Sequence, residues 1–134
     1  MQLKVSTDYA IRIVLHLAVK GGAATSSEIS GQMGVPRSVI ATLAKPLQKA
    51  GILTTQRGTG GGFALGRRPE DISLYAIINA MEGTTRINRC LEPDGYCSRN
   101  GVETCPVHKF YTRIQSYLDE AFQDKTIASL MEDA

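Results

Sequence analysis

With 134 residues, of which 43% are hydrophobic, the chain can form one domain with a core, and its three cysteines are an odd number that argues against a disulfide framework. It has no run of the ~18 apolar residues that a membrane span needs, and its first 22 residues do not resemble a signal peptide, so we expect a cytoplasmic protein. The net charge of +2 is unevenly placed: residues 1–70 hold nine Lys and Arg against three Asp and Glu, and residues 71–134 hold six against ten. A basic first half is typical of a module that binds a polyanion.

The first predicted helix covers residues 6–20, where apolar side chains recur at helical spacing. Ser6 or Thr7 is expected to cap it, and a Gly-Gly pair ends it. Asp8 lies in the first turn. There it either complements the helix dipole or serves as an oxygen ligand that reaches a metal centre elsewhere in a dimer.

Two further helices, residues 25–34 and 36–50, are predicted on either side of a short turn, with a kink or a shortened last turn at Pro46. Two helices joined in this way, the second with polar residues near its start, indicate a helix-turn-helix. The exposed face of the second helix would then meet base edges and phosphates, and it carries Arg37, Ser38, Ala41, Thr42 and Lys45.

A β-hairpin is predicted after these helices, with strands at residues 52–56 and 62–65. The tip between them contains four glycines, which give it little bulk, and Arg57 stands at its base, where a guanidinium can enter a minor groove. A hairpin in this position predicts a winged helix-turn-helix. The alternatives are a plain hairpin or a nucleotide-binding loop, but the GxxxxGK[ST] pattern of the latter is missing.

All three cysteines lie after a predicted helix at residues 71–81, in the pattern Cys90-x6-Cys97-x7-Cys105-x2-His108. The segment is rich in turn-forming residues, so we expect a loop until a helix begins near the last cysteine. Three thiolates followed by an imidazole one helical turn later suit a metal or iron–sulfur site. The alternatives are small buried cysteines and a surface histidine.

A long helix is predicted from about residue 105 to 124, followed by a short one at 127–131. Its aromatic and aliphatic stripe is wide, and the preceding domain is already complete, so the stripe is expected to face a second copy of the chain. The alternative is that it packs on the chain's own first helix. The predicted fold class is therefore mainly α: a winged helix-turn-helix with a long C-terminal dimerisation helix.

Together, the opening helix, the turn into residues 36–51, the wing sequence RGTGGGFALGR and the three cysteines resemble the Rrf-type family of bacterial transcription regulators, with its IscR-like and NsrR-like members. The resemblance covers nearly the whole chain. It implies a homodimer that binds palindromic promoter DNA, with one iron–sulfur cluster per subunit.

The resemblance implies that Cys90, Cys97 and Cys105 are cluster ligands. In IscR-like proteins the fourth ligand is a histidine at the position of His108, and in NsrR-like proteins it is an aspartate at the position of Asp8. Both are present here, so the cluster can be [2Fe–2S] or [4Fe–4S].

From these observations we expect a repressor whose promoter affinity is controlled by a cluster that senses nitric oxide, redox state or iron. Base edges would be read by Arg37, Ser38, Ala41 and Thr42, and phosphates and the minor groove would be met by Lys4, Lys45, Arg57, Thr59 and Gly60. The expected organisation is a DNA-binding domain at 1–83, a cluster-binding loop at 84–105, and a dimerisation helix and tail at 106–134. The alternatives are a zinc-stabilised module or a clusterless regulator. The chain is not expected to be an enzyme, because it shows no triad, carboxylate pair or nucleotide loop.

Overall fold

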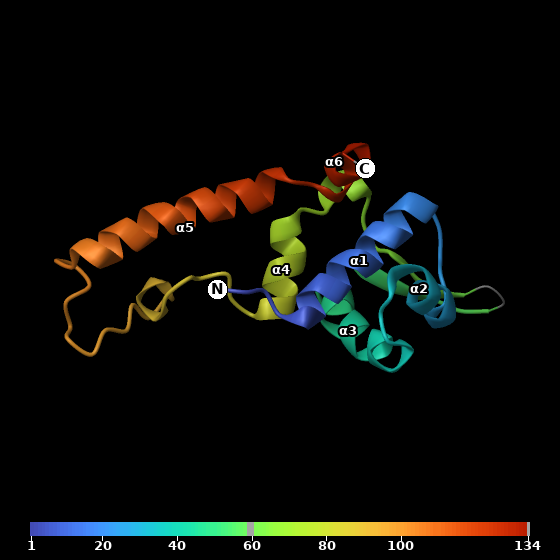
Figure 1. Cartoon of the computed structure of the whole chain (residues 1–134), viewed down its shortest axis with the longest axis horizontal. Coiled ribbons are helices and arrows are strands. Elements are labelled where there is room, and N and C mark those ends of the chain that lie inside the picture. Colours follow the sequence, from blue (N-terminus) through green and yellow to red (C-terminus); the bar gives the residue numbers. More distant parts are fainter. Residues whose placement is uncertain (59–60, 134) are drawn as a thin grey trace.

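A computed structural model describes residues 1–58 and 61–133 (Figure 1). The elements follow in the order α1 (Val5–Lys20), α2 (Ser26–Met33), α3 (Arg37–Lys49), β1 (Leu53–Gln56), β2 (Gly62–Leu65), the 3₁₀ turn η1 (Pro69–Asp71), α4 (Leu74–Glu82), the 3₁₀ turn η2 (Arg89–Leu91), α5 (Pro106–Asp124) and α6 (Ile127–Glu132). This confirms the predicted fold class, mainly helical with a two-stranded wing.

The first part of the chain, with α6, forms a compact head around an aliphatic core. Ile13, Leu17, Ile40 and Leu47 are among its fully buried side chains, and α6 adds Ile127. These residues recur every three or four positions on α1 and α3, so each helix buries one stripe and exposes the other. The head thus combines the helix-turn-helix, the wing and the last helix in one unit.

Helix boundaries in the head follow the local sequence at most ends. The Thr25 hydroxyl accepts a hydrogen bond from the Glu28 N–H and caps α2, and the Ser73 hydroxyl does the same for α4. Gly21 and Gly83 end α1 and α4 in the left-handed conformation that glycine adopts without strain. Pro46 lies inside α3, which continues to Lys49.

Two predicted boundaries are wrong. The N-cap of α1 is Lys4, without a side-chain capping bond, because Thr7 is fully buried and its hydroxyl instead donates to the Glu82 carboxylate. The helix expected from residue 71 starts at Leu74, since the chain first makes a 3₁₀ turn and then an extended residue, Ile72, whose carbonyl accepts from Ile127 N–H at 2.8 Å.

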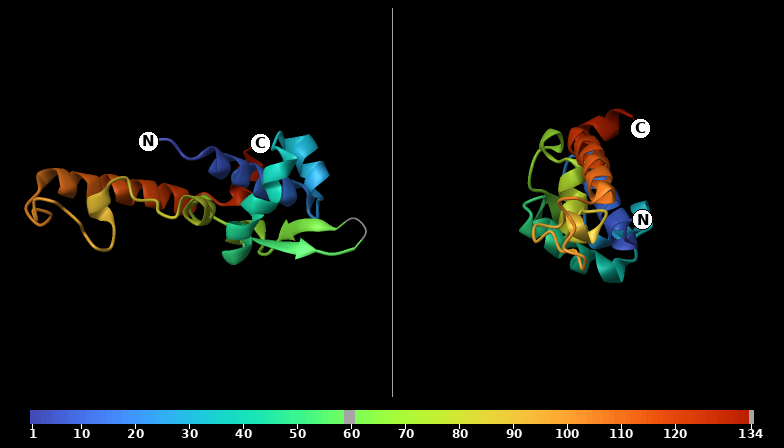
Figure 2. Two further views of the ribbon diagram at one scale, coloured as in Figure 1. Left: turned by 90° about the horizontal axis from the view of Figure 1, so that it is seen from below. Right: turned by 90° about the vertical axis from the view of Figure 1, so that its left-hand side faces the viewer.

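Residues 84–124 form an arm that projects from the head (Figures 1 and 2). The cysteine segment runs outward beside α5, and α5 returns to the head, where α6 begins. The returning chain is fastened by a hydrogen bond from Leu74 N–H to the Lys125 carbonyl at 2.8 Å. None of the helices in the described ranges combines the length and hydrophobicity needed to span a bilayer.

Candidate functional site

The outer face of α3 presents the residues predicted to read DNA. Arg37, Ser38, Ala41, Thr42 and Lys45 are all exposed. On the opposite side Ile40, Leu43 and Leu47 are buried in the head core. None of these exposed side chains makes a hydrogen bond within the described part of the chain, so their polar groups are available to bases and phosphates.

The wing is fixed to the helices beside it. β1 and β2 pair in antiparallel register, with Gln56 opposite Gly62, and Phe63 exchanges two 2.9 Å backbone hydrogen bonds with Ala24 in the α1–α2 connection. Gly62 lies so close to this connection that an added Cβ would stand 2.1 Å from the Ala24 carbonyl oxygen. The wing position is therefore determined by backbone contacts.

Arg57 is exposed at the end of β1, as the predicted minor-groove contact requires. Thr59 and Gly60, also predicted to contact DNA, lie outside the described residues. Lys4 is exposed just before α1, and its backbone N–H donates to the Glu82 carboxylate at 3.1 Å, which leaves its ammonium group toward solvent.

The three cysteines line one cavity of about 260 Å³ at the arm, between the cysteine segment and the start of α5. His108, in the first turn of α5, lines the same cavity. All three cysteines are free thiols and all are half-buried. The structure thus brings together four of the five residues predicted to bind a metal.

Cys90 is the cysteine with the most side-chain partners. The Nδ1 atom of His108 lies 3.1 Å from its sulfur, and the Asn88 amide donates to the same sulfur at 3.1 Å. The Cys105 sulfur accepts the His108 backbone N–H at 3.4 Å and so caps α5, which fixes His108 one turn above it. His108 is consequently held between two of the three sulfurs.

Cys97 lies on the outer part of the segment, where backbone N–H groups of Gly101 and Arg99 lower the pKa of its thiol because they stabilise the thiolate. Nearby, Arg89 forms a two-bond ion pair with Asp94 at 2.5 and 2.6 Å, and its guanidinium lies 5.3 Å from the centre of the Tyr96 ring. These contacts stiffen the turn that leads from the first cysteine to the second.

Within the described residues no three His, Cys, Asp or Glu side chains are close enough together to bind a single ion as they stand. A tetrahedral zinc site needs all four ligands around one atom, whereas a cluster of several irons joins ligands that are farther apart. Three thiols and an imidazole around one open cavity are a donor set that fits an iron–sulfur cluster.

Asp8, the other candidate for the fourth ligand, is not at this cavity. Its carboxylate is exposed on α1 and pairs with Arg12 at 2.7 Å, one turn further along the same helix. Within one chain, only His108 of the two candidates is beside the cysteines.

Sequence reasoning missed two polar residues that hold the cysteine segment, Asn88 and Gln115. Asn88 stands two residues before the first cysteine, and a polar residue so close to a predicted ligand is a weak signal. Gln115 interrupts the apolar pattern of α5 seven residues after His108, and this interruption could have been found.

The match to a family of known proteins extends along residues 3–133, and the family, Rrf2, is described as an iron-dependent transcriptional regulator. An HTH-type transcriptional regulator of Haemophilus influenzae is 33% identical over 126 residues, which cover 90% of this chain and 82% of that protein. The HTH-type transcriptional regulator IscR of Aliivibrio salmonicida is 27% identical over 135 residues, covering 99% and 79% of the two chains.

Among solved structures, CymR of B. subtilis, the global cysteine regulator, superimposes with a TM-score of 0.81 at 23% identity and covers 100% of this chain and 98% of its own. IscR of T. potens gives 0.78 at 21% identity, covering 99% and 88%. Both likenesses concern the fold, and they extend over the head and the arm alike.

Proposed function

Because the chain belongs to the Rrf2 family of transcriptional regulators, with a winged helix that binds DNA, we propose that it is a repressor whose promoter affinity depends on an iron–sulfur cluster. The observation that carries this proposal is the single cavity lined by Cys90, Cys97, Cys105 and His108. The three thiolates and the His108 imidazole are the proposed ligands, and the cluster is [2Fe–2S] or [4Fe–4S]. When bound, it supplies one-electron redox chemistry and a site for nitric oxide.

The chain's own residues turn this chemistry into a change of conformation. With the ligands engaged, Cys97 and Cys105 are tied to Cys90 and the segment is held against α5. Without them, the Cys90 sulfur keeps its hydrogen bonds to His108 and Asn88 and the Cys105 sulfur keeps the His108 backbone N–H, while no contact within the described residues ties Cys97 to the other two, so the 90–105 loop reorganises. The DNA affinity of the dimer then changes with the state of the arm.

The proposed partner at α5 is a second copy of the chain. Val107, Phe110 and Tyr117 are 51%, 50% and 66% exposed, and they lie within one broad stripe of α5. Large apolar side chains left uncovered at this spacing favour an intermolecular contact. A homodimer with twofold symmetry presents two α3 helices, which matches a palindromic promoter.

For DNA recognition we propose that Arg37, Ser38, Ala41 and Thr42 face base edges in the major groove. Lys4, Lys45, Arg57, Thr59 and Gly60 are the proposed phosphate and minor-groove contacts. The segments 1–83, 84–105 and 106–134 are then the proposed DNA-binding domain, the cluster-binding loop, and the dimerisation helix with its C-terminal tail, of which α6 packs in the head.

The test is anaerobic purification with visible spectroscopy and iron and sulfide analysis, followed by gel-shift titration of a palindromic promoter with the loaded and the cluster-free protein. A brown protein whose two forms differ at least about tenfold in affinity supports the proposal. A colourless zinc protein, or equal affinities, overturns it.

Two variants decide the fourth ligand. His108→Ala is expected to change the spectrum and make the cluster more labile, whereas Asp8→Ala is expected to leave both unchanged. The opposite result would place Asp8 of the partner subunit at the cluster. A protein in which all three cysteines are replaced by Ala and DNA binding is regulated normally would support the clusterless alternative.

A further inference from the structure

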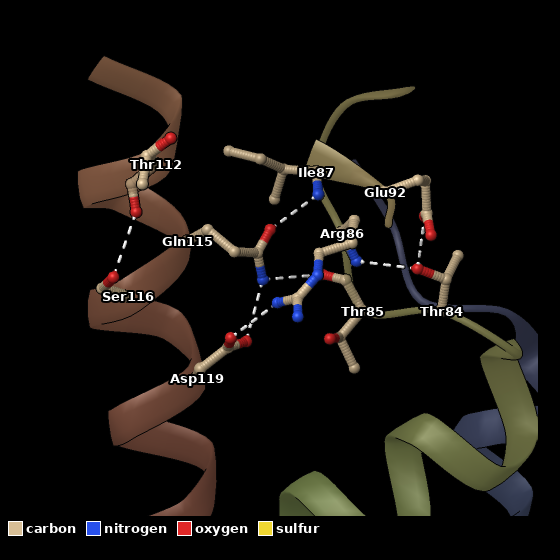
Figure 3. A network of polar contacts seen from close by, with 9 residues as sticks. All are labelled: Thr84, Thr85, Arg86, Ile87, Glu92, Thr112, Gln115, Ser116 and Asp119. Carbon is tan, nitrogen blue, oxygen red and sulfur yellow. Dashed lines mark hydrogen bonds and ion pairs between the residues drawn. The ribbon is translucent and has the colours of Figure 1, made fainter. Parts of the chain in front are cut away.

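Gln115 is the one buried side chain of the arm within the described residues, with 5% of its surface exposed. Its Oε1 accepts the Ile87 N–H at 2.8 Å, and its Nε2 donates to the Thr85 carbonyl at 2.9 Å and to Asp119 at 2.8 Å. Figure 3 shows this amide reaching from α5 to the segment that leads into the cysteines. Both of its donors are satisfied, and two of its three bonds join the segment's backbone.

A second contact fastens the same stretch. Arg86 donates to the Asp119 carboxylate at 2.8 Å, and these side chains are 35% and 21% exposed. Asp119 therefore binds Gln115 and Arg86 at once (Figure 3). Residues 85, 86 and 87 are each joined to α5 by Gln115 or Asp119, whereas Cys90 meets α5 through His108.

The spacing of these contacts links the two ends of the segment. Gln115 follows His108 by seven residues, so both side chains point from the same face of α5, roughly 10.5 Å apart along its axis. The three residues from Ile87 to Cys90 span at most about 10–11 Å when extended. With Ile87 opposite Gln115, the chain is long enough for Cys90 to meet His108, although Arg89 and Cys90 are in the 3₁₀ turn η2. A slip of one helical turn would move Cys90 about 5 Å along α5 from His108.

We propose that Gln115 is a positioning residue that sets the register of residues 85–90 on α5 and thereby holds Cys90 beside His108. Its consequence for cluster binding rests on the proposed function, but the register itself is a property of the cluster-free chain. A backbone amide and a carbonyl held by one buried side chain resist sliding, because any slip leaves three polar groups without partners.

The test measures the distance between positions 90 and 108 without iron. In the full chain carrying Cys97→Ser, Cys105→Ser and His108→Cys, diamide oxidation forms a disulfide between Cys90 and the thiol introduced at 108. Adding Gln115→Met keeps the size of the side chain and removes its hydrogen bonds. We expect this to slow the cross-link at least about tenfold, because all three hydrogen bonds of the Gln115 amide are lost.

Gln123→Met is the matched control, since Gln123 is an exposed glutamine on the same helix. It should leave the rate unchanged. Equal rates for the Gln115→Met and Gln123→Met proteins would overturn the proposal. If Gln115→Met does not fold, Gln115→Glu decides instead: it keeps an acceptor for Ile87 N–H and loses the donor to Thr85, so an intermediate rate is expected, and an unchanged rate would overturn the claim.

A separate measurement addresses the cluster. If wild-type protein binds iron and sulfide, Gln115→Met should make the loss of iron to a chelator several times faster. It should also change the visible spectrum, because Cys90 is no longer held beside His108. If wild-type protein binds neither, the proposed function fails while the cross-linking result still stands on its own.

Discussion

In the described chain every buried aliphatic side chain belongs to the head, from Ala10 on α1 to Ile127 on α6, whereas the arm buries a single side chain, the polar Gln115. The head is stabilised by the burial of its apolar side chains away from water, and this burial needs no second molecule. The arm is held by hydrogen bonds and ion pairs at its inner face and leaves Phe110 and Tyr117 uncovered. The head is thus stabilised by its own buried core, whereas the arm leaves apolar side chains that a binding partner could cover.

The sharpest test of this difference removes the same kind of group from each region. Leu47→Ala in the head should lower the free energy of unfolding by about 2–5 kcal/mol, because Leu47 is fully buried. Val102→Ala in the arm, where Val102 is only half-buried, should cost less than about 1 kcal/mol. Urea unfolding followed by circular dichroism measures both, and comparable losses would contradict the contrast.

The wing joins the head through backbone contact. Gly62→Ala should cost about 1–3 kcal/mol of stability and weaken DNA binding, since the new Cβ meets the Ala24 carbonyl and the φ of +133° is strained for alanine. Gly22→Ala is the control, because a Cβ there meets nothing within 4 Å. Thermal unfolding and gel shifts report the two effects. A Gly62→Ala protein that behaves like Gly22→Ala would show that the wing is not fixed in this way.

The uncovered face of the arm should matter for association and not for folding. Tyr117→Asp places a charge on the exposed stripe and should weaken dimerisation at least about tenfold with little change in melting temperature. Lys109→Glu also introduces a negative charge, with a larger change in net charge, but beside the stripe, and it should have a much smaller effect. Sedimentation velocity over a dilution series decides. If the Tyr117→Asp protein dimerises as tightly as the wild-type protein, the dimer interface does not include this stripe.

The smallest expected effect concerns the exposed turn of the cysteine segment. Two hydrogen bonds from Arg89 lower the pKa of Asp94 from its ordinary 3.8 to about 2. Because the pKa of Asp94 is lower in the folded state than in the unfolded state, the contribution of the Arg89–Asp94 pair to folding stability is complete above pH 3.8. It is lost as the pH falls toward 2. A carbon-13 NMR titration of the Asp94 carboxyl should show this midpoint, and Arg89→Gln should return it toward 3.8. A wild-type midpoint already near 3.8 would rule out the ion pair in solution.

The head could be predicted well from sequence because its signals are local. Apolar spacing, Thr25 and Ser73 as caps, and Gly83 as a terminator each act within a few residues. The errors arose where a distant residue competes, since Thr7 bonds Glu82, 75 positions away, and so does not cap α1.

The arm was harder to predict. The spacing of the cysteines and His108 predicted a shared site, and these four residues do line one cavity, but which of them contact one another could not be predicted. That Cys90 meets His108 depends on how the segment lies on α5, whereas the pairing of Asp8 with Arg12 is a local contact within α1. The residue that holds it there, Gln115, is polar, and sequence patterns identify buried apolar residues far better than buried polar ones.

The arm is attached to the head at both ends of α4. The outgoing chain leaves after Glu82, whose carboxylate binds α1, and the returning chain is bonded to residues 72–74 at the other end. Because α4 has nine residues, these two attachments lie roughly 13 Å apart. Because the arm is attached at two separated points, it is not expected to rotate independently of α4. Since α4 packs on both α1 and α3, we expect a rotation of the arm to move α3, the helix predicted to contact DNA, together with α4.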